Sequence, residues 1–221
     1  MIEIRDITKT YTIARKKVMA VDNANFSVQP GEIMSVIGHS GSGKTTLLSL
    51  IGGLTRPDSG TVYINGNNIW SMSDNELSDF RNKTISFIYQ FASLIPTLTV
   101  FENVMLPVTF GPHGEDRSSC AKQLCDIVGL SDKLKSYPSQ LSGGQQRRVA
   151  IARAFITDPQ IVLADEPTGD LDEETEAEMM QFFKKMNAEK STIFVIVTHS
   201  TELAKQTHRQ LKMSNGVVTA S

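Results

Sequence analysis

Two stretches of the chain carry residue types that act on phosphate groups. The first is GHSGSGKT, Gly38 to Thr45, which follows the apolar run IMSVI and precedes the helix-like run TTLLSLIGGL. Glycines let consecutive backbone N–H groups turn inward around nucleotide phosphates, and a following helix adds the positive end of its dipole. In such a P-loop (Walker A motif), Lys44 reaches the β- and γ-phosphates and the Thr45 hydroxyl binds Mg²⁺. The residues predicted to contact the nucleotide here are Gly38, His39, Ser40, Gly41, Ser42, Gly43, Lys44, Thr45 and Thr46.

The second stretch is IVLADE, which ends in the acidic pair Asp165 and Glu166. Asp165, at the end of an apolar run, is placed to hold the Mg²⁺ shell in a Walker B arrangement. Glu166 is placed to orient or deprotonate a water that attacks the γ-phosphate. Because phosphoryl transfer needs mainly positioning and charge stabilisation, one carboxylate and the metal suffice. The two stretches together predict hydrolysis of a nucleoside triphosphate.

Three further polar residues are candidates for the same site. His199 follows the apolar run TIFVIVT and is predicted to donate to the γ-phosphate, and Gln90 follows ISFIY and is predicted to bind Mg²⁺ or water. Tyr11 is predicted to stack on the adenine ring. Taken alone, each of the three is equally an ordinary structural residue. The positions of His199 and Gln90 at strand ends are what favour a role in the site.

The base of the nucleotide is indicated by a missing motif. Guanine-specific P-loop proteins usually carry an [NT]-K-x-D stretch, and the nearest match here is NKTI, Asn82 to Ile85, which lacks the aspartate. The sequence therefore favours ATP as the nucleotide.

The elements that must position these residues form an α/β pattern. The runs IMSVIG, ISFIYQ, IVLADE and TIFVIVTH are continuously apolar, which is typical of strands buried on both faces of a mostly parallel sheet. Each run ends at a polar or glycine-rich position, and ligands of open α/β sheets bind beyond the carboxyl ends of the strands. We therefore expect all four strand ends to meet at one site. Helical periodicity predicts helices over 44–51, 118–128, 145–155 and 174–187.

The remaining pattern predicts two additions to this core. Apolar residues near the start, together with GTVYINGNNI at residues 60–69, predict short antiparallel strands, with Asn65-Gly66 as a turn signal. Between Gln90 and Pro159 no run is typical of a buried strand, so this region is expected to be mostly helical. The predicted organisation is one domain over residues 1–221, with a core at 1–90 and 160–221 and an inserted helical subdomain at 91–159.

Composition limits the function classes. The 221 residues are 40% hydrophobic and 21% charged with a formal net charge of −2, which argues against a protein that coats nucleic-acid phosphates and leaves a local basic patch as the alternative. The longest apolar stretch, Phe91 to Val108, is broken by Pro96 and Pro107 and is not expected to insert into a membrane. Cys120 and Cys125 are expected to be free thiols in a reducing compartment. We therefore expect a cytoplasmic protein whose membrane role, if any, comes through a partner.

The pentapeptide LSGGQ, Leu141 to Gln145, stands before LADEPTGDLD and makes the chain resemble the ABC (ATP-binding cassette) ATPases along its whole length. The resemblance implies a P-loop NTPase fold of RecA-like type with ATP and Mg²⁺ as ligands. It also implies Tyr11 as the adenine-stacking aromatic, Gln90 as the Q-loop glutamine and Gly169 to Asp172 as the D-loop. Glu166 becomes the catalytic base and His199 the switch histidine. Metal ligands would be Thr45, Gln90 and Asp165, and Lys44 would join the catalytic set.

The signature stretch offers a second anion site in a chain that already has one. The Gly143 and Gly144 amides and the helix start near Gln145 present donors and a positive dipole end. In ABC proteins two cassettes meet head to tail, so that this helix start caps the γ-phosphate held by the other copy. The resemblance therefore implies an ATP-dependent homodimer that uses Ser142, Gly143, Gly144, Gln145 and Asp172. The alternative is an ordinary helix capped by Ser142.

Two longer stretches, IPTLTVFENVMLPV and EPTGDLDEETEAEMM, are similar to the lipoprotein-release and macrolide-efflux group of cassettes (LolD-like and MacB-like). That similarity implies an integral membrane permease as partner and a peripheral location on the inner face of the cell membrane. Part of the stretch 91–108 would then line a groove for a permease helix, the alternative being core packing. The acidic run 172–178 is expected to be a solvated helix face. Two rival classes are a soluble ABC ATPase of DNA repair or translation and a non-hydrolysing nucleotide clamp.

Overall fold

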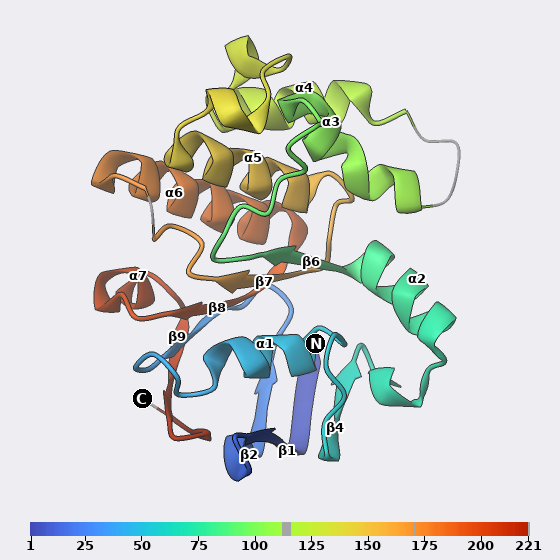
Figure 1. The fold of residues 1–221 in the computed structure, drawn as a ribbon, viewed down its shortest axis with the longest axis vertical. Helices are drawn as coiled ribbons and strands as arrows, with labels where there is room; N and C mark the ends of the chain where they lie inside the picture. The colour runs from blue at the N-terminus through green and yellow to red at the C-terminus, as the bar shows by residue number, and fades with distance from the viewer. Residues whose placement is uncertain (112–115, 170, 221) are drawn as a thin grey trace.

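Two β-sheets with helices packed around them make up the computed structural model, which describes residues 1–111, 116–169 and 171–220 (Figure 1). The strands are β1 (Ile2–Ile13), β2 (Lys16–Val28), β3 (Ile33–Ile37), β4 (Ser59–Ile64), β5 (Asn67–Asn68), β6 (Ile85–Ile88), β7 (Ile161–Asp165), β8 (Ile193–Thr198), β9 (Arg209–Ser214) and β10 (Val217–Ala220). The α-helices are α1 (Lys44–Ile51), α2 (Asp74–Thr84), α3 (Val100–Met105), α4 (Ser118–Ile127), α5 (Gly143–Phe155), α6 (Glu173–Lys190) and α7 (Thr201–Lys205).

The central sheet has the strand order β10-β9-β3-β8-β7-β6, and all its pairs are parallel except β9 with β10. Strands β3, β7 and β8 are buried on both faces, which explains their continuous apolar sequences. In β7, for example, Val162 and Ala164 pack into one hydrophobic core, whereas Ile161 and Leu163 pack into another on the opposite face. The predicted α/β fold with a mostly parallel sheet is confirmed.

The second sheet is antiparallel, with the order β2-β1-β4-β5, as expected for the N-terminal region. The expectation of short strands is wrong, because β1 has 12 residues and β2 has 13. They are joined by a two-residue turn, Ala14 and Arg15, with φ values of 47° and 67°. The register of the β1–β2 pairing shifts between Ile4 and Thr10, where Asp6 of β1 and Asn23 of β2 have positive φ. Both strands continue beyond these irregularities.

The helices lie on both sides of the central sheet. Figure 1 shows α3 to α6 above β6, β7 and β8, and α1 with the antiparallel sheet below them. The predicted helices are found, with α1 spanning the predicted 44–51 and α5 beginning at Gly143 instead of Gln145. The described part of residues 91–159 contains helices and no strand. The domain boundaries at 90/91 and 159/160 stay a prediction.

The stretch 91–108 is divided between core and surface. Val100 and Val104 are fully buried against α4 and α5, whereas Phe91 is 76% exposed and Ile95 is 40% exposed. Core packing therefore accounts for part of its apolar character only. Among the helices that the structure describes, none has the length and apolar composition needed to cross a membrane.

Candidate nucleotide site

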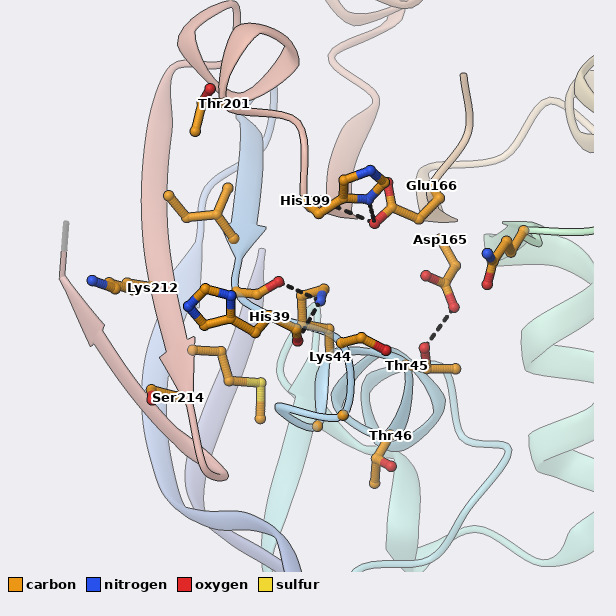
Figure 2. Close-up of a pocket in the computed structure, with 17 residues that line it drawn as sticks. His39, Lys44, Thr45, Thr46, Asp165, Glu166, His199, Thr201, Lys212 and Ser214 are labelled. Atoms are coloured by element: carbon orange, nitrogen blue, oxygen red, sulfur yellow. Dashed lines mark hydrogen bonds and ion pairs between the residues drawn. The ribbon is translucent and has the colours of Figure 1, made fainter. Parts of the chain in front are cut away.

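A cavity of about 870 Å³ opens beyond the carboxyl ends of β3, β7 and β8 (Figure 2). Its volume lies in the range of small-molecule sites, which is roughly 300–1,000 Å³. The four predicted strand ends do meet here. The predicted site residues that line the cavity are Gly38, His39, Ser40, Gly41, Gly43, Lys44, Thr45, Thr46, Gln90, Asp165, Glu166 and His199.

The P-loop presents bare backbone to this cavity. In the described chain no side chain caps the start of α1, whose N-cap residue is Gly43 at φ 108°, so the first-turn amides are free to meet an anion. Lys44 is 9% exposed, and its Nζ donates to the carbonyl oxygens of Gly38 (2.7 Å) and His39 (3.1 Å). A buried ammonium held by neutral carbonyls is suited to exchange them for phosphate oxygens.

Thr45 and Asp165 form the part of the site that fits a metal. The Thr45 hydroxyl donates to Asp165 Oδ2 at 2.7 Å, and Figure 2 shows the two side chains facing each other. Burial raises the pKa of the Asp165 carboxyl above its usual range, and the hydrogen bond from Thr45 partly offsets the shift. A hydroxyl, a carboxylate and the nearby Gln90 amide supply hard oxygen ligands, which are the kind that Mg²⁺ takes beside phosphate. The donor set therefore fits Mg²⁺.

Glu166 is held by the end of β8. Its backbone has φ 47°, and its N–H donates to Val197 O at 2.9 Å. Oε1 accepts from the His199 N–H (2.8 Å) and lies 2.7 Å from His199 Nδ1, while Oε2 accepts from the Thr198 hydroxyl (2.8 Å). Thr198, 1% exposed, was not predicted as a site residue. Its position beside His199 was the one sequence signal available.

Two arginines of α5 hold the segment that contains Gln90. Arg147 Nη1 donates to Tyr89 O at 2.6 Å, and the Arg153 guanidinium donates to Ala92 O (2.8 Å) and Ser93 O (2.9 Å). Because these carbonyls lie on both sides of Gln90 in the chain, the helix and the Q-loop segment are tied together at two points.

The signature stretch does not line the cavity of its own chain. Ser142 caps α5 in a capping box: its Oγ accepts from Gln145 N (3.2 Å), and its N–H donates to Gln145 Oε1 (3.0 Å). Ser142 and Gly143 are exposed, and a Cβ added to Gly143 would meet no atom within 4 Å. Gly144 is likewise absent from the cavity wall. This helix start is therefore open to a ligand or surface outside its own cavity.

Three other predicted residues also lie outside the cavity wall. Tyr11 is 38% exposed near the end of β1, with Lys9 Nζ 5.7 Å from the centre of its ring. The Ser42 hydroxyl is buried without a hydrogen-bond partner among the described residues. Asp172 caps α6 by accepting from Thr175 N at 2.9 Å. Asp170, in the predicted D-loop, lies outside the described residues.

Sequence reasoning missed one side of the cavity. It is formed by the end of β3, the start of α7 and strand β9, through Ile37, Thr201, Lys212, Met213 and Ser214. β9 pairs with β3 only in the folded chain, so its proximity to the P-loop has no local sequence signal.

Comparison with known proteins places this geometry in a family. A sequence model of the ABC transporter family matches residues 21–169. The lipoprotein-releasing system ATP-binding protein LolD of Cytophaga hutchinsonii is 45% identical over 214 residues, which are 96% of this chain and 96% of that protein.

Solved structures agree with this assignment. The dimeric structure of MJ0796, a bacterial ABC transporter cassette, superposes with a TM-score of 0.94 at 40% identity, covering 99% of this chain and 96% of that one. The dimeric post-hydrolysis state of the cassette MJ0796 bound to ADP and Pi gives a TM-score of 0.92 at 38% identity, with the same coverage. Because the family model matches more than half of the chain and these relatives match nearly all of it, this chain belongs to the ABC transporter family as an ATP-binding, ATP-hydrolysing subunit.

Proposed function

We propose that this chain works as the ATPase of a membrane transport complex in which two copies close head to tail around two ATP molecules. The supporting observation is that the signature helix start is separate from the nucleotide cavity of its own chain. Ser142 is exposed, yet it lies outside the cavity that is lined by Lys44 and Glu166. An anion site that its own chain does not use is explained by a phosphate that a second copy presents. The MJ0796 cassette, a relative with nearly the same fold, is dimeric.

Within each site, the P-loop amides, the α1 dipole and Lys44 bind the β- and γ-phosphates, and Tyr11 stacks on adenine. Thr45, Asp165 and Gln90 hold Mg²⁺, which neutralises charge on the phosphate oxygens. Lys44 exchanges its contacts with the loop carbonyls for phosphate oxygens. Ser142, Gly143, Gly144 and Gln145 of the second copy, with Asp172 nearby, complete the site.

Glu166 acts as the general base. Its carboxylate accepts a proton from the water that attacks the γ-phosphate, while the Thr198 hydroxyl keeps Oε2 turned toward β8. The His199 side chain is 75% exposed, so it is free to leave Glu166 and donate to the γ-phosphate. Hydrolysis removes the phosphate that bridges the two copies, and the dimer reopens.

The mechanical partner is an integral membrane permease, which makes this chain a peripheral protein on the inner face of the cell membrane. Phe91 and Phe110 are 76% and 74% exposed, and large apolar side chains of this kind are suited to dock a permease segment. The similarity to LolD favours a lipoprotein-releasing complex. In this proposal the segments 1–90 and 160–221 bind the nucleotide, and 91–159 transmits the movement.

The decisive experiment is Glu166→Gln, with Glu178→Gln on the exposed face of α6 as the matched control. Removing a general base lowers the rate by about 10²–10⁴-fold, so the variant should bind MgATP and remain trapped as a dimer in size-exclusion chromatography. The control should hydrolyse at the wild-type rate. A Glu166→Gln protein that stays monomeric with ATP and turns over normally would refute the role of Glu166. A wild-type protein with no turnover, even with its permease, would favour the non-hydrolysing clamp, and tight DNA or ribosome binding would favour a soluble ATPase.

A further inference from the structure

The turn between β9 and β10 touches the P-loop. It is a two-residue turn, because Ser214 pairs with Val217, and its residues Asn215 and Gly216 have φ values of 48° and 84°. Although it is a turn residue, Gly216 is buried. Its N–H donates to Ser42 O at 3.0 Å, and its carbonyl accepts from Asp22 N at 2.9 Å. One residue therefore bridges the P-loop and β2.

The hydrogen bond to Ser42 O has a consequence for the next amide. In a trans peptide the C=O and N–H point in opposite directions, so fixing the Ser42 carbonyl toward Gly216 fixes the Gly43 N–H on the other side. Gly43 lines the nucleotide cavity. The turn therefore sets the direction of a backbone donor that the P-loop presents to phosphate.

The same side of the P-loop is closely enclosed by β2 and β9. A Cβ on Gly43 would lie 1.9 Å from Ala20 O and 2.7 Å from Met213 Cε. A Cβ on Gly38 would lie 2.2 Å from Met213 O. With backbone on these sides and the turn behind Ser42, displacement of the turn is transmitted to the loop instead of being absorbed by free space.

We propose that the Asn215-Gly216 turn is a positioning element of the nucleotide site, in which the Gly216 N–H orients the Ser42–Gly43 peptide so that the Gly43 amide faces the phosphates. The inference rests on the proposed binding of ATP in this cavity and adds a turn whose two residues do not themselves line the cavity. It predicts that the occupancy of the site and the order of this turn depend on each other.

The chain contains a matched turn that lacks this contact. Asn65 and Gly66 connect β4 to β5 with φ values of 50° and 81°, nearly those of Asn215 and Gly216. Gly66 is exposed, and a Cβ there would meet no atom within 4 Å, whereas a Cβ on Gly216 would lie 2.9 Å from Met19 O. The same substitution at both glycines therefore imposes similar backbone strain, but disturbs the P-loop at one of them only.

The first test uses the intact wild-type protein. Because coupling between two sites is reciprocal, MgATP should slow hydrogen exchange of the Gly216 amide and leave the Gly66 amide unchanged. Equal behaviour of the two amides in protein shown by calorimetry to bind MgATP would overturn the inference. Failure of the wild-type protein to bind MgATP at all would instead count against the proposed function.

The second test compares Gly216→Asn with Gly66→Asn, since asparagine is among the residues that best tolerate positive φ. Loss of one oriented hydrogen bond should weaken MgATP binding about 3- to 10-fold in Gly216→Asn, with kcat at saturating ATP within about twofold of the wild-type value. Gly66→Asn should bind MgATP like the wild type. Equal affinity in the two variants, or a fall in kcat without a rise in KM, would overturn the inference. If Gly216→Asn fails to fold, the exchange measurement alone decides.

Discussion

At the residue scale, the geometry around Glu166 shows how the proposed general base is held at the edge of the cavity. A non-glycine residue at φ 47° pays a backbone cost of roughly 1–2 kcal/mol, and here the bond from its N–H to Val197 O and the donors of His199 and Thr198 hold it in place. The His199 side chain is 75% exposed and free to leave, whereas the buried Thr198 hydroxyl and the His199 backbone N–H stay in place. Thr198 is therefore the fixed side-chain donor to the Glu166 carboxylate, on Oε2, beside the fixed backbone donor on Oε1.

Thr198→Val removes the hydroxyl that donates to Glu166 Oε2 with almost no change of shape. Because hydrogen bonds to charged groups contribute about 1.5–3 kcal/mol, we expect kcat to fall by roughly 10- to 100-fold with little change in ATP affinity. Thr198→Ser, which keeps the hydroxyl, should recover most of the rate. Thr192→Val is the control, since its buried hydroxyl bonds Pro159 O at 3.4 Å, outside the cavity wall. A serine variant as slow as the valine variant would contradict this role.

At the element scale, two helices begin with the same serine capping box, but only one of them is proposed to bind phosphate. Ser73 caps α2 and Ser142 caps α5, and each forms a capping box with the residue three positions later. Locally the two helix starts are equivalent. Both starts are exposed, but the first turn of α2 carries the acidic Asp74 and Glu76, whereas the first turn of α5 has a glycine pair and no acidic residue.

This equivalence gives a paired prediction for Ser142→Arg and Ser73→Arg. Each loses a side-chain cap, at a cost of about 1 kcal/mol of unfolding free energy, so thermal unfolding should shift similarly in both. Only Ser142→Arg should prevent ATP-dependent dimerisation, because the new side chain occupies the phosphate position, and neither variant should lose ATP binding as a monomer. Size-exclusion chromatography with MgATP in a Glu166→Gln background checks this. If Ser142→Arg also lost nucleotide affinity, the signature would act within its own chain.

The elements differ in how far their sequences foretell them. The start of α1 was predictable because the glycine-rich loop ends at Lys44. The four strands that end at the site were predictable because each is an unbroken apolar run. In contrast, α2 was not predicted, because it is mostly polar and has Leu77 as its single buried apolar residue. Its Ser73 and Glu76 capping box was the signal that could have revealed it.

Tertiary pairing accounts for most of what the sequence could not show. The turn between β1 and β2 is Ala14-Arg15, which lacks the Asn-Gly or Asp-Gly signal of a hairpin. The sequence therefore did not show that two long strands pair here, and short strands were predicted instead. The part of the candidate site that could be predicted lies at strand ends followed by a recognisable motif, such as the P-loop or the pair Asp165 and Glu166. Lys212 reaches the site through the pairing of β9 with β3, and no local pattern in the sequence marks it.

At the scale of the whole molecule, the central sheet separates two hydrophobic cores. One contains Phe183 and Phe194 with the buried faces of α4 and α5, and the other contains Leu47 and Ile51 of α1 with the antiparallel sheet. The helices above the sheet therefore pack in a core separate from that of α1 and the antiparallel sheet. Cys125 of α4 is buried in this core, so its reactivity measures how often the core opens.

Thiol reactivity measures how tightly that region is closed. Burial raises the pKa of the Cys125 thiol to about 11, so in the folded protein it stays protonated until the pH approaches that value. At pH 8 only about one thousandth of it is thiolate, and iodoacetamide should modify the half-buried Cys120 first, as mass spectrometry can show. In urea both should react at similar rates. Equal modification of the two thiols in the native protein would mean that α4 opens readily.

The hydrogen bonds from Arg147 and Arg153 couple the position of α5 to the position of the segment around Gln90. The N-terminal end of α5 carries the exposed Ser142, while Arg147 and Arg153 donate to backbone carbonyls on the two sides of Gln90, in the segment that includes Phe91. Because α5 is bonded to the backbone on both sides of Gln90, we expect a displacement of exposed Phe91 to move the Gln90 segment and the helix start at Ser142 together. Arg147 and Arg153 would therefore couple these two movements, although neither arginine lines the nucleotide cavity.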